Sequence, residues 1–534
     1  MTESIWRRQH YLFFAGAIVL SLVAAACLPV LSRVNFGKNS VSSGGANVLY
    51  FDVPAPIGSL DPRDPFEAGG KCAFPLLYSR LFLVGADGRV GPELAVKWSY
   101  DPGELTWTIH LRRNAFFHDG RQVTAKDIAY SVERCSKEGV PVYRPETERS
   151  ILLSETSIAF VLKWDDPDFL WKISRLDVLP ADAPEWADSV GPPVGSGPFR
   201  FDYRVGEDEV RLVANEDYYF GRPSLDAVVF RYVGDRERSW ARLLADRTDI
   251  ATEIYPKDRE MMDRCRDKVR FNERVVKSYA LLLYNVNDPL FSDSRVRRAL
   301  SHAVDTGYIV KRLLRGFGVP ACGPAGVGSP YANEGRQPLS YDPGKSRELL
   351  KDAGWAPDKD SGCLSKGGKR FEFTLSIFEG DQTYKRVAEY IQLCFNDLGI
   401  RAHIETLPFR ELVRRYNGND EFQAVITELR GAYENPLPMA CLWTAAYGCG
   451  SNVGCFEDGR VTEWLFRALR EKDPARRRGL VRLADARIVS LQPATFLYHK
   501  TALDVISGRI LVSSPFSYDF SHIYQLKDAR IAAP

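Results

Sequence analysis

The sequence predicts an exported α/β protein that folds into more than one lobe. The chain has 534 residues, more than one hydrophobic core usually holds, so two or three domains are expected. Strand-like and helix-like hydrophobic patterns are mixed along the whole length with no repeat period, which is typical of α/β folds. An uncharged segment near the N-terminus, preceded by basic residues, indicates export.

The N-terminal segment has the length and charge of a membrane helix. Arg7 and Arg8 precede an uncharged run over residues 11–31, which as a helix measures about 31 Å and is long enough to cross a bilayer. Positive charge keeps this end in the cytoplasm and directs the remainder outward. We therefore expect residues 1–31 to be a signal or anchor helix and residues 32–46 to be a flexible tether. The protein would lie on the periplasmic side of the cytoplasmic membrane, N-terminally anchored.

Three outcomes for this segment stay open. An uncleaved anchor is the favoured interpretation. Residues 24–27, Ala-Ala-Ala-Cys, look like a lipoprotein cleavage site at which Cys27 is lipidated, although that motif prefers Leu where Ala24 stands and residues 28–31 remain apolar. Ordinary secretion after cleavage is the third outcome.

The charge balance gives no indication of a nucleic-acid partner. The chain has 71 basic and 69 acidic residues, whereas nucleic-acid binding requires a clustered basic face. The one basic triplet, Arg476–Arg477–Arg478, is expected to lie on the solvent-exposed face of a helix.

Cysteine usage indicates an oxidising compartment. Cys27 lies in the predicted anchor, and the other nine of the ten cysteines would be exported, where disulfides persist. An odd number leaves at least one free thiol. The sequence places Cys441, Cys449 and Cys455 close enough for a local disulfide, while Cys322 and Cys363 could close a larger loop.

Hydrophobic periodicity predicts the main elements. Trp107, Ile109 and Leu111 share one face of a strand at 105–111. A helix at 124–134 is expected to begin at Thr124, an N-cap residue with Asp127 three positions later. Further strands are expected at 47–53, 157–164, 209–215 and 400–406, and further helices at 294–315 with a break near 306–307, at 386–398, at 461–470 and at 474–490.

The sequence gives little support for catalysis or metal binding. His118–Asp119 resembles part of a catalytic triad, but the ring of His118 is better explained as a partner for buried backbone groups. Gly195–Ser196–Gly197 lacks the spacing of a Gly-x-Ser-x-Gly nucleophile motif, and its glycines suit a backbone turn. The seven histidines include no pair at three- or four-residue spacing, and no Walker A loop is present. We therefore predict no enzyme activity, no catalytic or metal-ligating residue and no cofactor.

Seven ordered groups of residues carry a family resemblance. They are Ser59–Pro62; Leu76–Leu81; Asp87–Ala95 with Trp98; Trp107–Arg112, Phe117–Gly120 and Thr124–Ser131; Gly195–Phe199 with Asn215–Tyr219 and Pro223–Asp226; Phe291–Leu300; and Tyr341–Pro343 with Leu349–Gly354. In this order they resemble the family 5 extracellular solute-binding proteins, the oligopeptide, dipeptide and nickel receptors of ABC importers. The resemblance extends from about residue 47 to 527.

The resemblance implies a two-lobed periplasmic-binding-protein clamp of type II, with an extra inserted domain and two chain crossings as the hinge. The first lobe would hold residues 47–70, 190–279 and 500–534, the inserted domain 71–189, and the second lobe 280–499. The function implied is an extracytoplasmic receptor, expected to be a monomer, that binds a peptide or similar polar small molecule between its lobes and docks on an ABC permease. A membrane-tethered sensor or scaffold is the alternative, and a nickel- or haem-type receptor is disfavoured by the scattered histidines.

The resemblance also locates the ligand contacts on the second lobe. Peptide-binding members pair their ligand with strand edges, and an Asp before a Tyr holds the peptide amine. The matching segment here is 424–436, in which Tyr433 keeps its place but Ala432 replaces the Asp. Either Glu434 or Glu428 therefore replaces the missing carboxylate, or the ligand has no free amine at this point.

Further candidate ligand contacts are predicted from position alone. Glu428 and Arg430 are two residues apart on a strand and face the same side, where they could bind a ligand cation and a carboxylate or phosphate, or pair with each other. The remaining candidates are Phe66 and Glu67 in the first lobe, and Trp443 and Tyr447 as aromatic walls.

Overall fold

The computed structural model describes residues 47–532 except for short gaps. The gaps are 64–68, 85–88, 139–145, 183–191, 253–263, 266–267, 359–360, 380–381, 409–410, 413, 416–421, 432–434, 446–451, 453 and 512–522, and nothing is described of the side chains of 135–138, 236 and 430. The predicted anchor and tether, 1–46, lie outside the described residues. Within the described part, no helix has the length and apolar character needed to cross a membrane.

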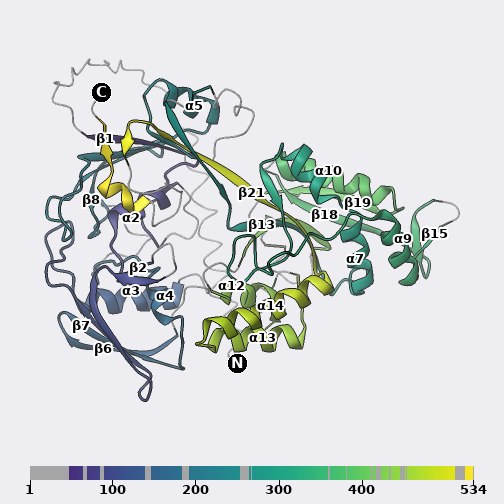
Figure 1. The fold of residues 1–534 in the computed structure, drawn as a ribbon, viewed down its shortest axis with the longest axis horizontal. Coiled ribbons are helices and arrows are strands. Elements are labelled where there is room, and N and C mark those ends of the chain that lie inside the picture. Colours follow the sequence, from purple (N-terminus) through teal and green to yellow (C-terminus); the bar gives the residue numbers. More distant parts are fainter. Residues whose placement is uncertain are drawn as a thin grey trace, which may run out of the picture. The chain divides into compact units, whose positions relative to one another are not determined.

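A twelve-stranded sheet runs through the molecule (Figure 1). Its strands are β1 (Val48–Val53), β8 (Phe199–Val205), β9 (Glu209–Ala214), β10 (Ala227–Tyr232), β11 (Ile250–Ala251), β12 (Val269–Val275), β13 (Ser278–Tyr284), β14 (Gly318–Pro320), β18 (Glu372–Phe378), β19 (Arg401–Leu407), β20 (Ala424–Arg430) and β21 (Ala494–Ser507). The main path is β19-β18-β20-β13-β21-β11-β1-β10-β9-β8, while β12 and β14 pair with β21.

One half of this sheet, centred on β1, has its own hydrophobic core. Strand β1 pairs in parallel with β10, and the ring centroids of Phe51 and Phe230 lie 5.4 Å apart in a tilted arrangement. The short helix α2 (Phe74–Leu77) and the C-terminal residues around Leu526 complete this core. Its residues therefore come from segments far apart in the chain.

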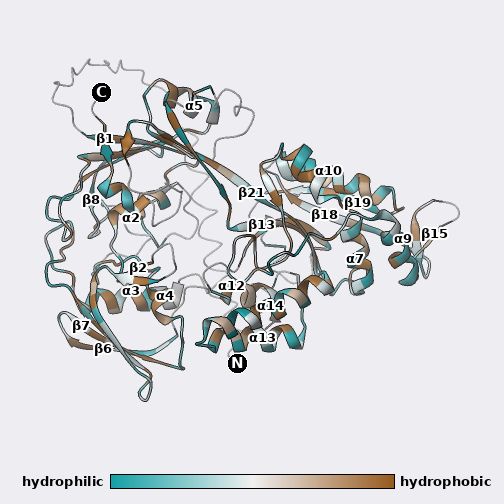
Figure 2. Cartoon of the chain, in the orientation of Figure 1, coloured by the Kyte–Doolittle hydropathy of each residue, from teal (hydrophilic) through white to brown (hydrophobic). Residues whose placement is uncertain are grey.

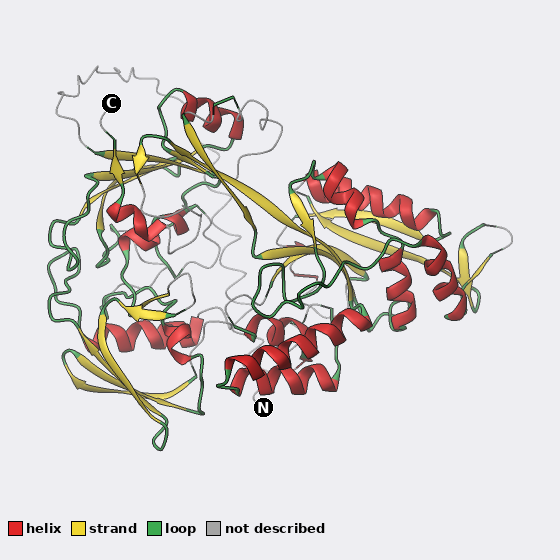
Figure 3. Ribbon diagram, in the orientation of Figure 1, coloured by secondary structure: helices red, strands yellow, loops and turns green. Residues whose placement is uncertain are grey.

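The other half, centred on β13, is covered on both faces. Leu282 and Leu281 alternate across β13 and belong to two different cores, as strand geometry requires. The helices α7 (Ser294–His302), α9 (Pro343–Asp352) and α10 (Gln382–Asn396) cover one face. The helices α12 (Leu437–Trp443), α13 (Gly459–Arg470) and α14 (Pro474–Leu491) cover the other (Figure 3).

A separate four-stranded antiparallel sheet forms another body with its own core. Its order is β4 (Ala95–Asp101), β5 (Thr106–Leu111), β7 (Ser157–Leu162) and β6 (Thr147–Ser154). The helices α3 (Ala125–Glu138) and α4 (Phe169–Ile173) accompany it. We call these strands and helices the four-stranded body. It lies within the predicted inserted domain, whose bounds, like those of the two lobes, stay predictions.

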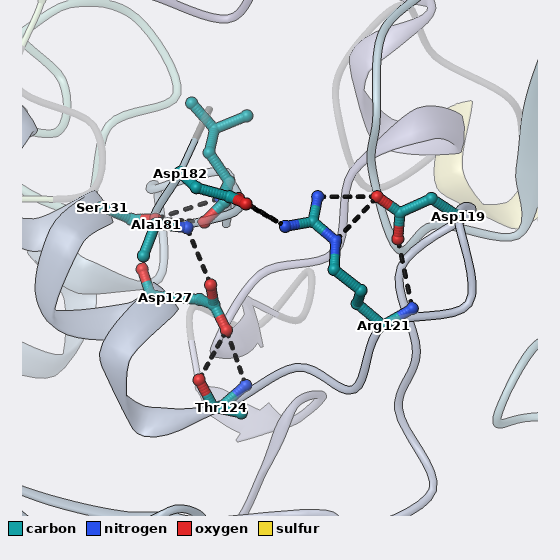
Figure 4. A network of polar contacts seen from close by, with 8 residues as sticks. Asp119, Arg121, Thr124, Asp127, Ser131, Ala181 and Asp182 are labelled. Atoms are coloured by element: carbon teal, nitrogen blue, oxygen red, sulfur yellow. Dashed lines mark hydrogen bonds and ion pairs between the residues drawn. The ribbon is translucent and has the colours of Figure 1, made fainter. Parts of the chain in front are cut away.

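The predicted start of the helix at Thr124 is confirmed. One carboxylate oxygen of Asp127 accepts hydrogen bonds from the Thr124 amide, at 2.8 Å, and from the Thr124 hydroxyl, at 2.7 Å. The other oxygen accepts the amide of Ala181 at 2.8 Å, so the helix start is tied to a distant loop (Figure 4). The Asp127 side chain thus satisfies backbone donors that the helix itself leaves open.

The turn at His118 has the structural role predicted for it. The ring Nε2 lies 3.1 Å from the Gly197 carbonyl oxygen, and the Gly195 amide donates to Nδ1 at 3.4 Å. Burial lowers the pKa of His118 to about 4, so the ring is neutral. The neighbouring Asp119 instead pairs with Arg121, which also reaches Asp182 (Figure 4).

The glycines of Gly195–Ser196–Gly197 serve a different purpose from the predicted turn. Neither has a positive φ. A Cβ on either residue would collide with the backbone at Leu76 and Leu77, so glycine is required by close packing of two backbones.

The predicted disulfides at Cys322, Cys363 and Cys441 are wrong, because these three residues carry free thiols. Cys322 follows Ala321, which packs in the core on one face of β13, whereas Cys363 precedes Leu364, which packs in the core on the opposite face. A disulfide requires Cα atoms within about 7 Å, which sequence proximity alone does not provide.

Candidate functional site

The two halves of the large sheet are joined where β21 and the chain from β12 to β13 pass between them side by side. Strand β21 pairs with β13 through its first part and with β12 through its second, and the change of partner falls between Tyr498 and Thr501. The chain passes from β12 to β13 at the same level, where the Val276 amide donates to the Lys500 carbonyl at 2.8 Å. This crossing (Figure 1) is the part of the fold suited to act as a hinge.

A polar cluster stands at this crossing, and Glu428 of β20 is its centre. Its carboxylate accepts hydrogen bonds from the Ser278 hydroxyl and from the Tyr384 hydroxyl, the latter at 3.0 Å. The Lys500 ammonium lies 3.2 Å from the same carboxylate and 4.9 Å from the ring centroid of Tyr384. Four elements, β13, β20, β21 and α10, thus contribute one side chain each.

Glu428 is ionised in this cluster, and its negative charge is compensated by Lys500. Burial would raise the pKa of Glu428, but the Lys500 charge and the hydrogen bonds from Ser278, Lys500 and Tyr384 outweigh burial, so this pKa is lowered. Burial lowers the pKa of His499, whose Nδ1 lies 2.9 Å from the Ser278 carbonyl. Glu428 is therefore a carboxylate whose charge is already matched by a neighbouring cation.

The end of β20 leads into the segment that the family resemblance associates with ligand contact. The Gly431 amide donates to the Lys277 carbonyl at 3.1 Å, which extends the pairing to the edge of the crossing. At the far side of the gap, the side-chain oxygen of Asn435 accepts the Leu437 amide at 2.9 Å and fixes the start of α12. The residues that flank this segment on both sides are therefore fixed by hydrogen bonds.

Two of the predicted ligand contacts have described side chains. Glu428 lies in the cluster above, and its ionic partner is Lys500. Trp443 has an exposed fraction of only 1% and packs against Phe456 and Phe496 in the core beneath α12. Its indole Nε1 has no hydrogen-bond acceptor among the described residues. Direct ligand contact stays a prediction for both side chains.

The remaining predicted contacts fall outside the described structure. Arg430 is placed as the last residue of β20, opposite Ser278, but its side chain is not described. The other residues that lie outside the described ranges are Phe66, Glu67, Ala432, Tyr433, Glu434 and Tyr447.

Sequence reasoning did not find Ser278, Tyr384 or Lys500. They are separated from Glu428 by long stretches of chain. Pairing of β13 with β20 and β21 brings Ser278 and Lys500 to it, and packing of α10 against the sheet brings Tyr384. One indication was available at Lys500, a single charge within the otherwise uncharged run 494–503, because an isolated charge in a buried strand requires a partner.

Among the residues that the structure describes, no group of three or more His, Cys, Asp or Glu side chains is arranged to hold a metal ion. The cluster at Glu428 offers one carboxylate, and that carboxylate is compensated by an ammonium group. It is thus suited to electrostatic and hydrogen-bonding roles.

The sequence model of the bacterial extracellular solute-binding proteins, family 5 (middle region), matches residues 89–450. The chain therefore belongs to this family of extracytoplasmic receptors of ABC importers, as the ordered motifs predicted.

Individual relatives agree with this assignment over most of the chain. The oligopeptide-binding protein AppA of Bacillus subtilis is 28% identical over 79% of this chain and 80% of its own length. The heme-binding protein A of Haemophilus influenzae is 26% identical over 93% of this chain and 96% of its own. The structure of AppA in complex with a nonapeptide superposes with a TM-score of 0.76 at 21% identity, covering 91% of this chain and 99% of AppA.

Proposed function

We propose that this protein is the solute receptor of an ABC-type importer and that it binds a peptide or a similar polar small molecule between its two lobes. In this proposal it is not an enzyme, acts as a monomer, and is held by its N-terminal segment at the periplasmic side of the cytoplasmic membrane. The lobes and the inserted domain have the bounds predicted from the sequence. The carrying observation is the crossing of β12–β13 with β21, beside which β20 ends.

The part of β20 beyond Val425 supports a ligand that makes backbone hydrogen bonds, because in the described sheet β18 pairs with β20 only at Ala424 and Val425. AppA, a peptide receptor, shares the fold over nearly its whole length. An extended peptide gains affinity from main-chain pairing without depending on its side chains. Peptide-like ligands with amide groups at regular spacing therefore fit the proposal better than sugars.

The charges and hydrogen bonds around Glu428 disfavour this residue as the contact for a ligand amine. Ala432 provides no carboxylate, and Glu428 already accepts hydrogen bonds from Ser278, Tyr384 and Lys500. A ligand ammonium at Glu428 would have to displace Lys500, which would leave a partly buried cation without its partner. We therefore assign the amine contact, for a ligand that has a free amine, to Glu434.

Thermal unfolding of the full chain in detergent, in the presence of separate panels of peptides, sugars and metal chelates, tests this function. A ligand that binds only the folded state raises the melting temperature, and the stabilisation grows with the logarithm of its concentration relative to Kd. We expect peptides to raise it. An increase with sugars or metal chelates alone would contradict the peptide assignment, and no increase with any panel would favour a sensor or scaffold role.

A further inference from the structure

Arg477, the central residue of the basic triplet on α14, does not lie on a solvated face. Its side chain has an exposed fraction of 13%, and its Nε donates to the Ala468 carbonyl of α13 at 3.0 Å. The two terminal nitrogens point at the carboxylate of Asp168, at 2.8 and 3.2 Å. This fork geometry is the arrangement in which Arg binds a carboxylate most strongly.

Asp168 belongs to the four-stranded body. It stands directly before α4, its side chain has an exposed fraction of 10%, and it makes no capping hydrogen bond to that helix. The neighbouring Asp166 is bound within the same body by Lys172 at 2.7 Å. Asp168 is thus directed away from its own body and toward α14.

A second ion pair lies beside the first. The Lys472 ammonium, between α13 and α14, is 2.5 Å from the carboxylate of Asp165, which also accepts a hydrogen bond from the Tyr100 hydroxyl at 2.8 Å. With exposed fractions of 58% and 37% this pair is solvated, so it contributes less than the buried pair. A small cavity of about 200 Å³ adjoins both pairs and is lined by Pro167 and Tyr331 among others.

Among the described residues, these contacts connect two parts of the molecule that are also joined at the strand crossing. The four-stranded body is linked in sequence to the half of the sheet around β1, and Tyr219, which follows β9, packs against the core of the four-stranded body. The helices α13 and α14 belong to the half around β13. Rotation about the crossing would separate Asp168 from Arg477 and return both charges to water.

We propose that Asp168 and Arg477 form a latch that holds the lobes closed, and that the four-stranded body acts in ligand capture by carrying one side of this latch. Both residues are positioning residues, because they act through closure and not by touching the ligand. The latch is formed in the closed state only, so it raises the population of that state and with it the apparent ligand affinity. This inference does not depend on the chemistry of the ligand.

Cross-linking of two introduced cysteines measures the closed population directly. The exposed pair is converted to cysteines in the full chain, Asp165→Cys with Lys472→Cys, and treated with a short bismaleimide without added ligand. Peptide mapping by mass spectrometry then quantifies the 165–472 cross-link over time. We expect this cross-link to form, and to form about tenfold more slowly when Asp168→Asn is added, because a partly buried Arg477 then loses its ionic partner.

Matched variants separate the latch from general effects on folding. Arg477→Gln should slow the cross-link as Asp168→Asn does, and Arg477→Lys should restore part of the rate because it keeps the charge but not the fork. Arg478→Gln is the control, since Arg478 makes no ion pair in the described part of the chain, and its rate should equal that of the parent. Unchanged melting temperatures would exclude unfolding as the cause.

Two results would overturn the proposal. One is the absence of any 165–472 cross-link in the parent protein, which would mean that the contact is not populated in solution. The other is an equal rate in the parent, Asp168→Asn and Arg477→Gln proteins. Neither result would affect the proposed function, because ligand binding is measured separately by thermal unfolding.

Discussion

Lys500 on β21 lies 3.2 Å from the carboxylate of Glu428 on β20, across the strand β13 that both flank. This pair stands where the chain passes between the two halves of the sheet. Breaking this pair should therefore affect both the stability of the half of the sheet around β13 and the geometry of the crossing.

Replacing Lys500 by Met should destabilise the protein. Lys500→Met leaves Glu428 as a mostly buried carboxylate without its cation, and we expect the free energy of unfolding to fall by about 1–3 kcal/mol. Urea unfolding measures this loss. Lys385→Met on the exposed side of α10 is the control and should change stability by less than about 0.5 kcal/mol. Equal effects of the two substitutions would show that the Glu428 pair contributes nothing specific.

Gly195→Ala should be among the most damaging single substitutions. The added methyl group would collide with the backbone at Leu77, which cannot move without disturbing α2. We expect a loss of about 3 kcal/mol or more, measured by urea unfolding or seen as poor soluble yield. Gly479→Ala in α14 meets nothing within 4 Å and should stabilise the protein by about 0.5–1 kcal/mol. A tolerated Gly195→Ala would disprove the packing explanation.

Glu93 should make stability depend on pH. Burial raises its pKa from 4.5 to about 8, although the Arg80 amide and the Tyr219 hydroxyl donate to it. Between these values the unfolded state binds fewer protons than the folded state, so the free energy of unfolding should fall as pH rises from about 4.5 to about 8.

Glu93→Gln removes this titration, and its stability should vary less over the same pH range. Urea unfolding at several pH values provides the comparison, with the exposed Glu104→Gln as the control. If wild-type protein and Glu93→Gln had the same slope, Glu93 would not be the group responsible.

The amine assignment predicts a selective effect of Glu434. For a peptide that binds with a free N-terminus, Glu434→Gln should weaken binding at least about tenfold, because a desolvated ammonium loses its carboxylate. Binding of the N-acetylated peptide should be unaffected by the same substitution. Calorimetric titration of both peptides measures the difference, with the exposed Glu457→Gln as the control. A loss for both peptides alike would contradict the assignment.

The sequence predicted local features better than distant contacts. The helix start at Thr124 and the role of His118 depend on neighbouring residues or on one turn, and each is present. A break in the predicted helix at 294–315 is also present, but it falls between His302 and Thr306, before the predicted position near 306–307. Local pattern is enough for such features because hydrogen-bond capping and periodicity act over a few residues.

Contacts between distant segments could not be predicted from such local patterns. Lys500 and Arg477 acquire their roles only when strands or helices from separate parts of the chain pack together. A run of three arginines indicates an exposed helix face on average, but the pattern does not reveal that one of them turns inward toward a carboxylate more than 300 positions away. The free thiols of Cys322 and Cys363 illustrate the same limit.

Native mass spectrometry of the full chain, purified from the cells that produce it naturally and released from detergent, tests the receptor assignment most directly. A protein that clamps peptides should carry a co-purifying mixture of short peptides, visible as a set of masses above that of the chain and released on denaturation. A single defined non-peptide compound would contradict the peptide part of the assignment, and a chain with no bound small molecule that also gains none when peptides are added would contradict the receptor function itself.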